Sequence, residues 1–348
     1  MEHQPQDLRS QTLNLVTSGA DAPNIADKEL VASLIRSWLT SLDEDDLLGI
    51  TPASLAKVLW QGFAQTVQRG AQSCQISSLS YADGRGGDAS ALLILNPDMP
   101  YLVDSLVMAL RKSRVAVNAV LNAVLAVKRD ASGKVESVAA VKDSQDPRES
   151  YVLVLLAEPV ASEPLDAIIA SVTMVAQDAA VVKHDAAAIT YKMRQIGLDA
   201  AKLGAEGEEV AAFMQWAQEE GFEAFGYAYY RVVDGAPELE RDVPSRIGVL
   251  KDTSHPVYGN CLANIPGDYK SLAARNHMLS VVKADVQGTL HRDQRLDFIG
   301  VRDSDESGKV LGEHCLVGLF TRAATTTAIA KLPIARLRVA KVLELAGV

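Results

Sequence analysis

The spacing of apolar residues predicts a helical arm near the start of the chain. Residues 1–26 are polar and aperiodic, so we expect them to be loose. From Asp27, a candidate N-cap, apolar residues recur every three or four positions, which is the spacing of a buried helix face. Thr51-Pro52 is typical of a second helix start, because proline in the first helical turn loses no hydrogen bond. The helical arm is therefore predicted over residues 27–72.

The next region, residues 73–204, combines short apolar runs with two helical patterns. An antiparallel sheet with helices on one face explains this mixture, because each helix has a single apolar stripe to bury. The arrangement is that of a ferredoxin-like α+β domain. The strands are expected at residues 91–95, 115–127, 135–141 and 151–157, and the helices at 101–113 and from 165 to about 202.

A second α+β domain is predicted over residues 205–348. It begins with an acidic helix around 206–220, and Gly308 lies in a hairpin-like loop between its last two strands. The chain ends directly after a closing helical pattern, which is typical of a domain truncated at its C-terminal end. The strands are expected at residues 222–233, 247–250, 279–283, 297–302 and 313–320, and the closing helix at 333–345.

Composition narrows the class of protein. The chain has 348 residues, enough for two or three domains, and its net charge of −10 argues against a nucleic-acid or anionic-membrane partner. The start of the chain lacks the basic and apolar segments of a signal peptide, and the longest apolar run, residues 115–127, is too short to span a bilayer. Three distant cysteines, Cys74, Cys261 and Cys315, imply no disulfide framework. We therefore expect a cytoplasmic protein.

Several phrases of the sequence resemble those of the large bacterial NAD-dependent glutamate dehydrogenases, in the same order along the chain. The family phrases are DMPFLVDS, FLGY, KxNxxSxVHR, DYIGVK and GExRFLGLFTS. Any one match is weak, whereas five in register are specific. The matching segments here are residues 98–105 (DMPYLVDS), 225–227 (FGY), 283–292 (KADVQGTLHR), 297–302 (DFIGVR) and 312–321 (GEHCLVGLFT).

The resemblance implies a parent several times longer than this chain, one that oxidatively deaminates L-glutamate to 2-oxoglutarate and ammonia with NAD. In that family the N-terminal region holds ACT-like regulatory modules, and the nucleotide-binding and catalytic parts lie far downstream. The implied segment is non-catalytic, with no catalytic residue and no cofactor of its own. Its implied partners are the downstream domains of the same polypeptide and further copies of itself in a homo-oligomer.

The best candidate site is the turn that connects the strand ending at Asn96 to the following helix. In ACT modules the equivalent loop often binds an amino-acid effector through backbone N–H groups and the positive end of the helix. Asp98 is a candidate helix cap or a partner for an effector's ammonium group. Such loops usually carry glycine where Tyr101 stands, and a tyrosine takes up the room that a ligand needs. The candidate effector-binding residues are Asn96, Asp98, Tyr101 and Asp104, with capping and packing as the alternative.

Other motifs favour structural explanations. Residues 84–89 match GxGxxA, but a strand-like run follows where a dinucleotide fingerprint needs a helix, which favours a hairpin turn. His314 and Cys315 are neighbours in a strand, point to opposite faces and cannot easily act together. The six histidines show no metal-binding spacing, so no metal site is expected. Lys283, Arg292 and Arg302 lie among acidic residues such as Asp285 and Asp297, as in ordinary exposed ion pairs.

Three hypotheses follow for the chain. The leading one is a regulatory and assembly segment built from ACT-like modules, in which sheet edges pair between subunits. The second is an amino-acid sensor whose occupancy controls a distant active site. The third is a self-contained enzyme, which ranks last because the sequence shows no phosphate loop, metal cluster or nucleophile motif.

Overall fold

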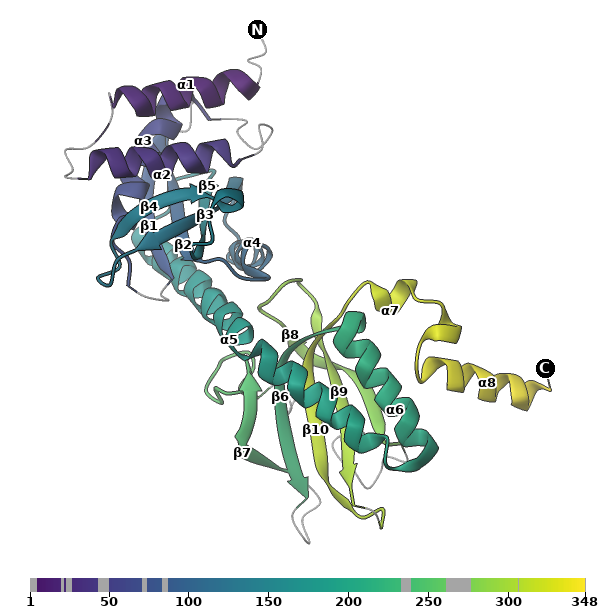
Figure 1. The fold of residues 1–348 in the computed structure, drawn as a ribbon. Helices are drawn as coiled ribbons and strands as arrows, with labels where there is room; N and C mark the ends of the chain where they lie inside the picture. The colour runs from purple at the N-terminus through teal and green to yellow at the C-terminus, as the bar shows by residue number, and fades with distance from the viewer. Residues whose placement is uncertain are drawn as a thin grey trace. The chain divides into compact units, whose positions relative to one another are not determined.

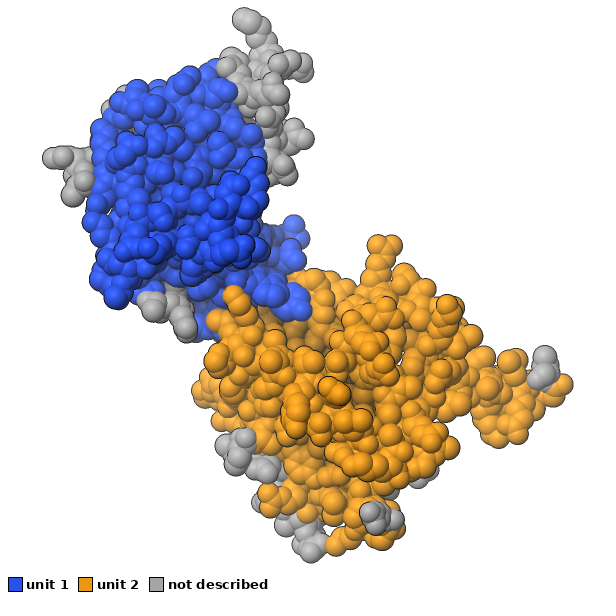
Figure 2. Space-filling view, viewed as in Figure 1, with its two compact units in different colours: residues 1–179 blue, residues 180–348 orange. Residues whose placement is uncertain are grey.

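The computed structural model describes residues 5–19, 22, 27–42, 50–70, 74–82, 87–232, 239–260, 277–305 and 307–347. The chain divides into two compact units, Met1–Ala179 (unit 1) and Ala180–Val348 (unit 2), which are coloured separately in Figure 2. The division falls inside one long helix, α5 (Ser162–Ala200), whereas the sequence placed a domain boundary after residue 204, where that helix has ended.

Three helices open unit 1: α1 (Pro5–Ser18), α2 (Lys28–Thr40) and α3 (Pro52–Thr66). The prediction of a loose stretch over residues 1–26 is wrong for the α1 segment, because Val16 and Thr12 are fully buried there and α1 packs on α3. The helical arm is confirmed. Thr51 caps α3, its hydroxyl accepting a 3.2 Å hydrogen bond from the Ser54 amide.

The sheet of unit 1 has the expected antiparallel ferredoxin-like core. β5 lies between β2 and β3, the two strands that α4 connects, and pairs antiparallel with both. β1 and β4 add an edge strand on each side, in the order β1-β2-β5-β3-β4. The elements are β1 (Gln75–Ala82), β2 (Asp88–Pro97), α4 (Leu102–Lys112), β3 (Val117–Arg129), β4 (Val135–Ala140) and β5 (Arg148–Leu156).

Both faces of this sheet are covered, because successive residues of a strand point to opposite sides. One face packs against α1–α3, where Phe63 stacks on Tyr151 at 5.2 Å and the Trp38 indole donates a 2.9 Å hydrogen bond to the Tyr151 carbonyl. The alternate residues, such as Ile94 and Val152, are also fully buried, on the side where Figure 1 shows α4 and the beginning of α5. The helical arm thus covers the face that the α4 and α5 layer leaves open.

In unit 2, the helices that pack on the sheet precede its strands in the chain. The second half of α5 and α6 (Gly204–Trp216) pack on one face of the sheet, with Met193, Phe213 and Tyr227 in the shared core. The five strands are antiparallel in the order β7-β6-β10-β9-β8, and in the described residues no helix separates β9 from β10. The strands are β6 (Phe222–Val232), β7 (Leu239–Gly248), β8 (Leu279–Gln287), β9 (Arg295–Ser304) and β10 (Val310–Phe320).

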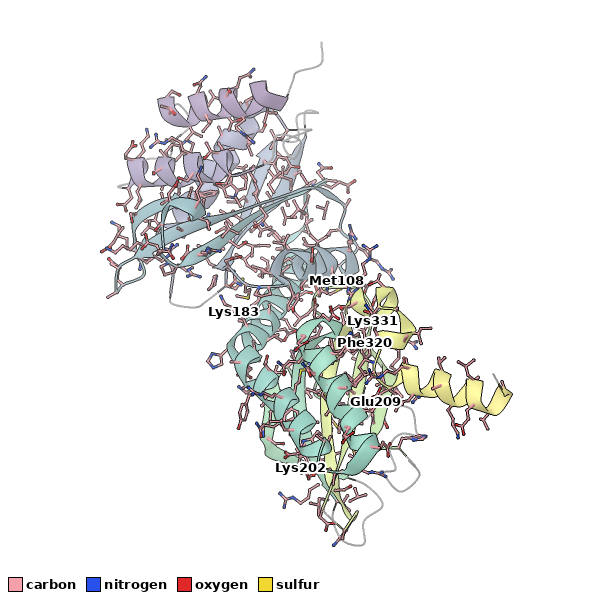
Figure 3. All side chains as sticks on the ribbon, turned by 45° about the vertical axis from the view of Figure 1, so that its right-hand side comes forward. Met108, Lys183, Lys202, Glu209, Phe320 and Lys331 are labelled. Atoms are coloured by element: carbon pink, nitrogen blue, oxygen red, sulfur yellow. The ribbon has the colours of Figure 1, made fainter. Side chains whose placement is uncertain are left out.

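The C-terminal helix α8 (Ala335–Ala346) has no buried residue and is fixed at its beginning. Glu209 on α6 lies beside this point (Figure 3) and accepts hydrogen bonds from Nε and Nη2 of Arg336 at 2.7 and 2.6 Å. The same carboxylate accepts a 2.8 Å bond from the Ile334 amide, at a residue with φ of 66°. One side chain therefore holds both the turn before α8 and the first turn of the helix.

By length and composition alone, α5 is the one helix among the described residues that could cross a membrane. Its apolar side chains take part in protein cores: Val172 and Val175 are buried, and Ile189, Met193 and Ile196 belong to the core of unit 2. Packing therefore explains much of its apolar character.

Candidate effector-binding site

The turn between β2 and α4 brings the predicted effector residues into one short segment. Asn96 is 2% exposed, and its amide nitrogen contacts the Met99 sulfur at 3.6 Å. The Asp98 backbone N–H donates a 2.9 Å hydrogen bond to the Arg148 carbonyl, which ties the turn to the start of β5. Asp104 is exposed in the first turn of α4. The polar side chains of the turn thus range from buried at its strand end to exposed at its helix end.

The N-cap residue of α4 is Tyr101. The sequence suggested Asp98 for this role. The φ of 66° and ψ of −4° place Tyr101 in the left-handed region, which glycine adopts readily and a bulky residue adopts at a cost of about 1–3 kcal/mol. Its carbonyl accepts hydrogen bonds from both the amide and the hydroxyl of the fully buried Ser105. The backbone of the turn therefore has the conformation of a glycine loop, although the residue is tyrosine.

The charges of the turn favour a cationic group over an anionic one. Asp98 and Asp104 contribute two carboxylates, and Asp104 already places negative charge in the first turn of α4, where the helix end is positive. A ligand ammonium would gain from these carboxylates, and a ligand carboxylate would be repelled by them. Effector binding at Asn96, Asp98, Tyr101 and Asp104 stays a prediction.

A buried charge cluster, which the sequence did not reveal, ties α3 to the sheet of unit 1. Glu149 is 2% exposed and accepts hydrogen bonds from Arg69 at 3.0 Å and from Arg129 at 2.7 and 2.9 Å. The Tyr151 hydroxyl donates to the same carboxylate at 3.0 Å, and burial raises the pKa of this phenol. Arg129 also donates to the carbonyls of Thr66, Val67 and Gly133. Since Arg69, Arg129 and Tyr151 all contact the Glu149 carboxylate, the cluster anchors the fold.

A second polar group lies on the helix-facing side of the sheet in unit 2. The Tyr227 hydroxyl and His314 Nδ1 share a 2.9 Å hydrogen bond, and the Tyr229 hydroxyl donates to Asp303 at 2.7 Å. Burial lowers the pKa of His314, which favours the neutral imidazole, and Lys192 lies 5.6 Å from the centre of the Tyr227 ring. Aromatic stacking and hydrogen bonds account for this group without a ligand.

The structure supports the structural explanations of the other motifs. β1 and β2 form an antiparallel hairpin closed by the pair Ala82 and Asp88, so a strand begins at the end of the GxGxxA segment; residues 84–86 of this segment lie outside the described residues. Cys315 is buried on the sheet face opposite His314.

An exposed ion pair joins Asp285 to Arg295 at 3.2 Å. Lys283 pairs with Asp297 at 2.8 Å, but the expectation of an exposed pair is wrong for Asp297, which is only 5% exposed. Arg292 donates a 2.8 Å hydrogen bond to the Phe320 carbonyl.

Burial raises the pKa of the Cys74 thiol to about 11, so this thiol is protonated at neutral pH. Among the described residues, no group of three or more His, Cys, Asp or Glu side chains is arranged to hold a metal ion.

The comparisons with known proteins agree with these observations. A family model described as "Glutamate dehydrogenase, ACT1 domain" matches residues 34–172, which lie within unit 1. An "NAD-specific glutamate dehydrogenase" of Halomonas elongata is 26% identical over 360 residues, covering 98% of this chain and 22% of the relative. The protein of the same name from Pseudomonas aeruginosa is 27% identical over 277 residues, covering 74% of this chain and 16% of the relative. The chain therefore spans about a fifth of the length of these relatives.

A solved structure of an RNA-binding light-oxygen-voltage receptor aligns with 89% of this chain and 90% of its own chain. Its TM-score of 0.14 and its sequence identity of 8% are too low to indicate a shared fold.

Proposed function

We propose that this chain is a regulatory and assembly segment without catalytic activity of its own, because residues 34–172 match the glutamate dehydrogenase ACT1 domain and the chain is similar to NAD-specific glutamate dehydrogenases. The parent would oxidatively deaminate L-glutamate to 2-oxoglutarate and ammonia with NAD bound in downstream domains of the same polypeptide. The proposed setting is the cytoplasm. Further copies of this chain would be its assembly partners.

The observation that carries the assembly role is the outer edge of β1. Among the described strands β1 pairs with β2 alone, and its sequence QISSLSYA contains no charge and no proline. Such an edge favours pairing with another strand, and proteins usually protect it with charged residues. β4, at the other edge of the sheet, is protected. On its outer side the Val135 amide donates a 2.9 Å hydrogen bond to the Val67 carbonyl, and Glu136 adds a charge.

Sedimentation equilibrium of the 348-residue chain tests this role. Ser78 and Ser80 are exposed on β1, so lysines there put charge along the edge without changing the core. We expect the wild type to self-associate and Ser78→Lys/Ser80→Lys to be monomeric. The matched control Ser137→Lys, at an exposed position of β4, should self-associate like the wild type. A monomeric wild type, or association that survives the double substitution, contradicts the assembly role.

The non-catalytic role has its own assay. The isolated chain, mixed with L-glutamate and NAD, should give no increase in absorbance at the wavelength of NADH. Glutamate-dependent reduction of NAD by this chain would defeat the proposal.

The alternative function is an ACT module that senses an amino-acid effector. The support for it is the glycine-like backbone at Tyr101, next to the carboxylates of Asp98 and Asp104. Calorimetry with a panel of amino acids tests it. Heat of binding that disappears in Asp98→Asn, but persists in the control Asp143→Asn outside the turn, supports sensing at this turn; no binding up to millimolar concentration leaves the assembly role alone.

A further inference from the structure

The helix α8 lies apart from the core of unit 2. None of its described residues is buried, and Figures 1 and 3 both show it projecting from the sheet and from α6. It is attached at its beginning, where Glu209 binds Arg336, and it ends at Gly347, which has the left-handed backbone of a C-cap. A helix of 12 residues is marginal in water on its own, because most helical stability in proteins comes from packing. The isolation of α8 therefore calls for a surface that covers it.

One face of α8 is apolar along its whole length. Its spacing of three and four positions is that of an amphipathic helix, and the residues are Ala335, Val339, Val342, Leu343 and Ala346. The side chains of Val339, Val342 and Leu343 are 41%, 64% and 46% exposed. A single exposed apolar residue is ordinary, whereas a row of them on one helix face is typical of a binding surface. This face fits an apolar groove.

The segment that contains α8 is the basic part of an acidic chain. Residues 322–348 contain five basic residues and one acidic residue, Glu344, whereas the whole chain has a net charge of −10. Two α8 helices packed on each other would bring like charges together, which disfavours a symmetric contact between copies through this helix. Arg338 is exposed beside the apolar face. The complementary partner is therefore an apolar groove with an acidic rim.

The lengths of the relatives indicate where such a groove is found. The relative from Halomonas elongata aligns with 98% of this chain, and the alignment covers 22% of that relative. The proposed parent likewise has its nucleotide-binding and catalytic domains outside this chain. A surface of those domains is linked covalently to α8, so it has a high effective concentration beside the helix.

We propose that α8 docks on the downstream part of the parent polypeptide, with Val339, Val342 and Leu343 in an apolar groove and Arg338 against an acidic residue at its rim. The inference rests on the proposed function, because it requires the longer parent. It adds the surface through which this segment contacts the rest of the enzyme. Self-association through β1 does not involve this helix, so the two contacts can form in the same assembly.

Hydrogen–deuterium exchange tests the docking by comparing the 348-residue chain with the full-length parent. The amides of α8 should exchange rapidly in the chain and at least about tenfold more slowly in the parent, where the helix is covered. α2, a buried helix of unit 1, is the internal control and should exchange alike in both. Equal exchange of α8 in the chain and the parent overturns the inference. Protection of α8 in the chain that grows with concentration also overturns it, because it assigns the surface to a second copy.

Val342→Glu in the parent puts a carboxylate on the apolar face. Leu337→Glu is the matched control, since five residues at about 100° each place it about 140° away around the helix. Both side chains are exposed, so both variants should fold like the wild type. We expect Val342→Glu to restore rapid exchange of α8 and Leu337→Glu to leave the protection unchanged. The same exchange in both variants contradicts docking through this face. A gene product of only 348 residues would instead defeat the proposed function, because it has no downstream part.

Discussion

Replacing Glu149 by glutamine tests whether the buried charge cluster holds unit 1 together. The substitution keeps the size of the side chain but removes the charge that Arg69 and Arg129 share. The side chain of Glu149 is 3% exposed, and those of Arg69 and Arg129 are 8% and 11% exposed. Breaking a buried ion pair by removing one partner costs about 3–5 kcal/mol, because the remaining charge stays out of water. We expect a loss of this size in the free energy of unfolding of unit 1.

Urea unfolding followed by tryptophan fluorescence measures this loss. Trp38 and Trp60 lie in unit 1, so a Trp216→Phe background confines the signal to that unit. The urea midpoint should fall by about 1–2 M with an unchanged slope. Glu136→Gln, which removes an exposed pair with Lys128, is the control and should cost less than about 1 kcal/mol.

Equal, small losses for both substitutions would refute the assignment of Glu149 as the anchor. If Glu149→Gln does not fold, the Arg69→Met background offers a second measurement. In this background Arg129 is the one remaining guanidinium beside position 149, so Glu149→Gln leaves less uncompensated charge. The loss in free energy of unfolding should therefore be smaller than in the presence of Arg69.

Three further outcomes are expected. Tyr101→Gly should be more stable than Tyr101→Ala by about 1 kcal/mol in urea unfolding, because only glycine is unstrained at this φ; equal stability would remove the argument for strain. Burial lowers the pKa of His314, so the unfolded chain binds the proton first and stability should fall as pH drops below the ordinary value of 6.5. His314→Gln should flatten that part of the pH profile; an unchanged profile argues against the buried neutral imidazole. Burial opposes ionisation of Asp185, yet hydrogen bonds from Lys251 and the Gly248 amide keep its pKa low. Its contribution should be lost as pH falls below 3.8, and Asp185→Asn should lack this acid-dependent loss.

Local patterns in the sequence predicted most elements of the fold. The helix expected over residues 101–113 is α4 (Leu102–Lys112), and the strand expected over 135–141 is β4 (Val135–Ala140). These elements carry strong periodic apolar patterns, which depend on near neighbours in the chain. α1 was missed because its few apolar residues gain their burial from α3, an element more than thirty residues away.

The sequence could place the β2–α4 turn but not its geometry. The left-handed backbone at Tyr101 depends on the hydrogen bonds of Ser105 and on the packing of α4, which no local pattern shows. The sequence also could not predict the ion pairs that anchor each unit. Glu149 contacts Arg69, 80 positions away in the chain, and Arg336 contacts Glu209, 127 positions away. Contacts of this range depend on the tertiary fold.

An ion pair between Glu209 and Arg336 attaches the start of α8 to α6. Ionic bonds weaken with salt, whereas apolar packing strengthens, and no side chain of this helix is buried. Leu332 and Ile334 pack on the core of unit 2 just before α8, so we expect salt to loosen the first turn of the helix and leave this apolar contact in place.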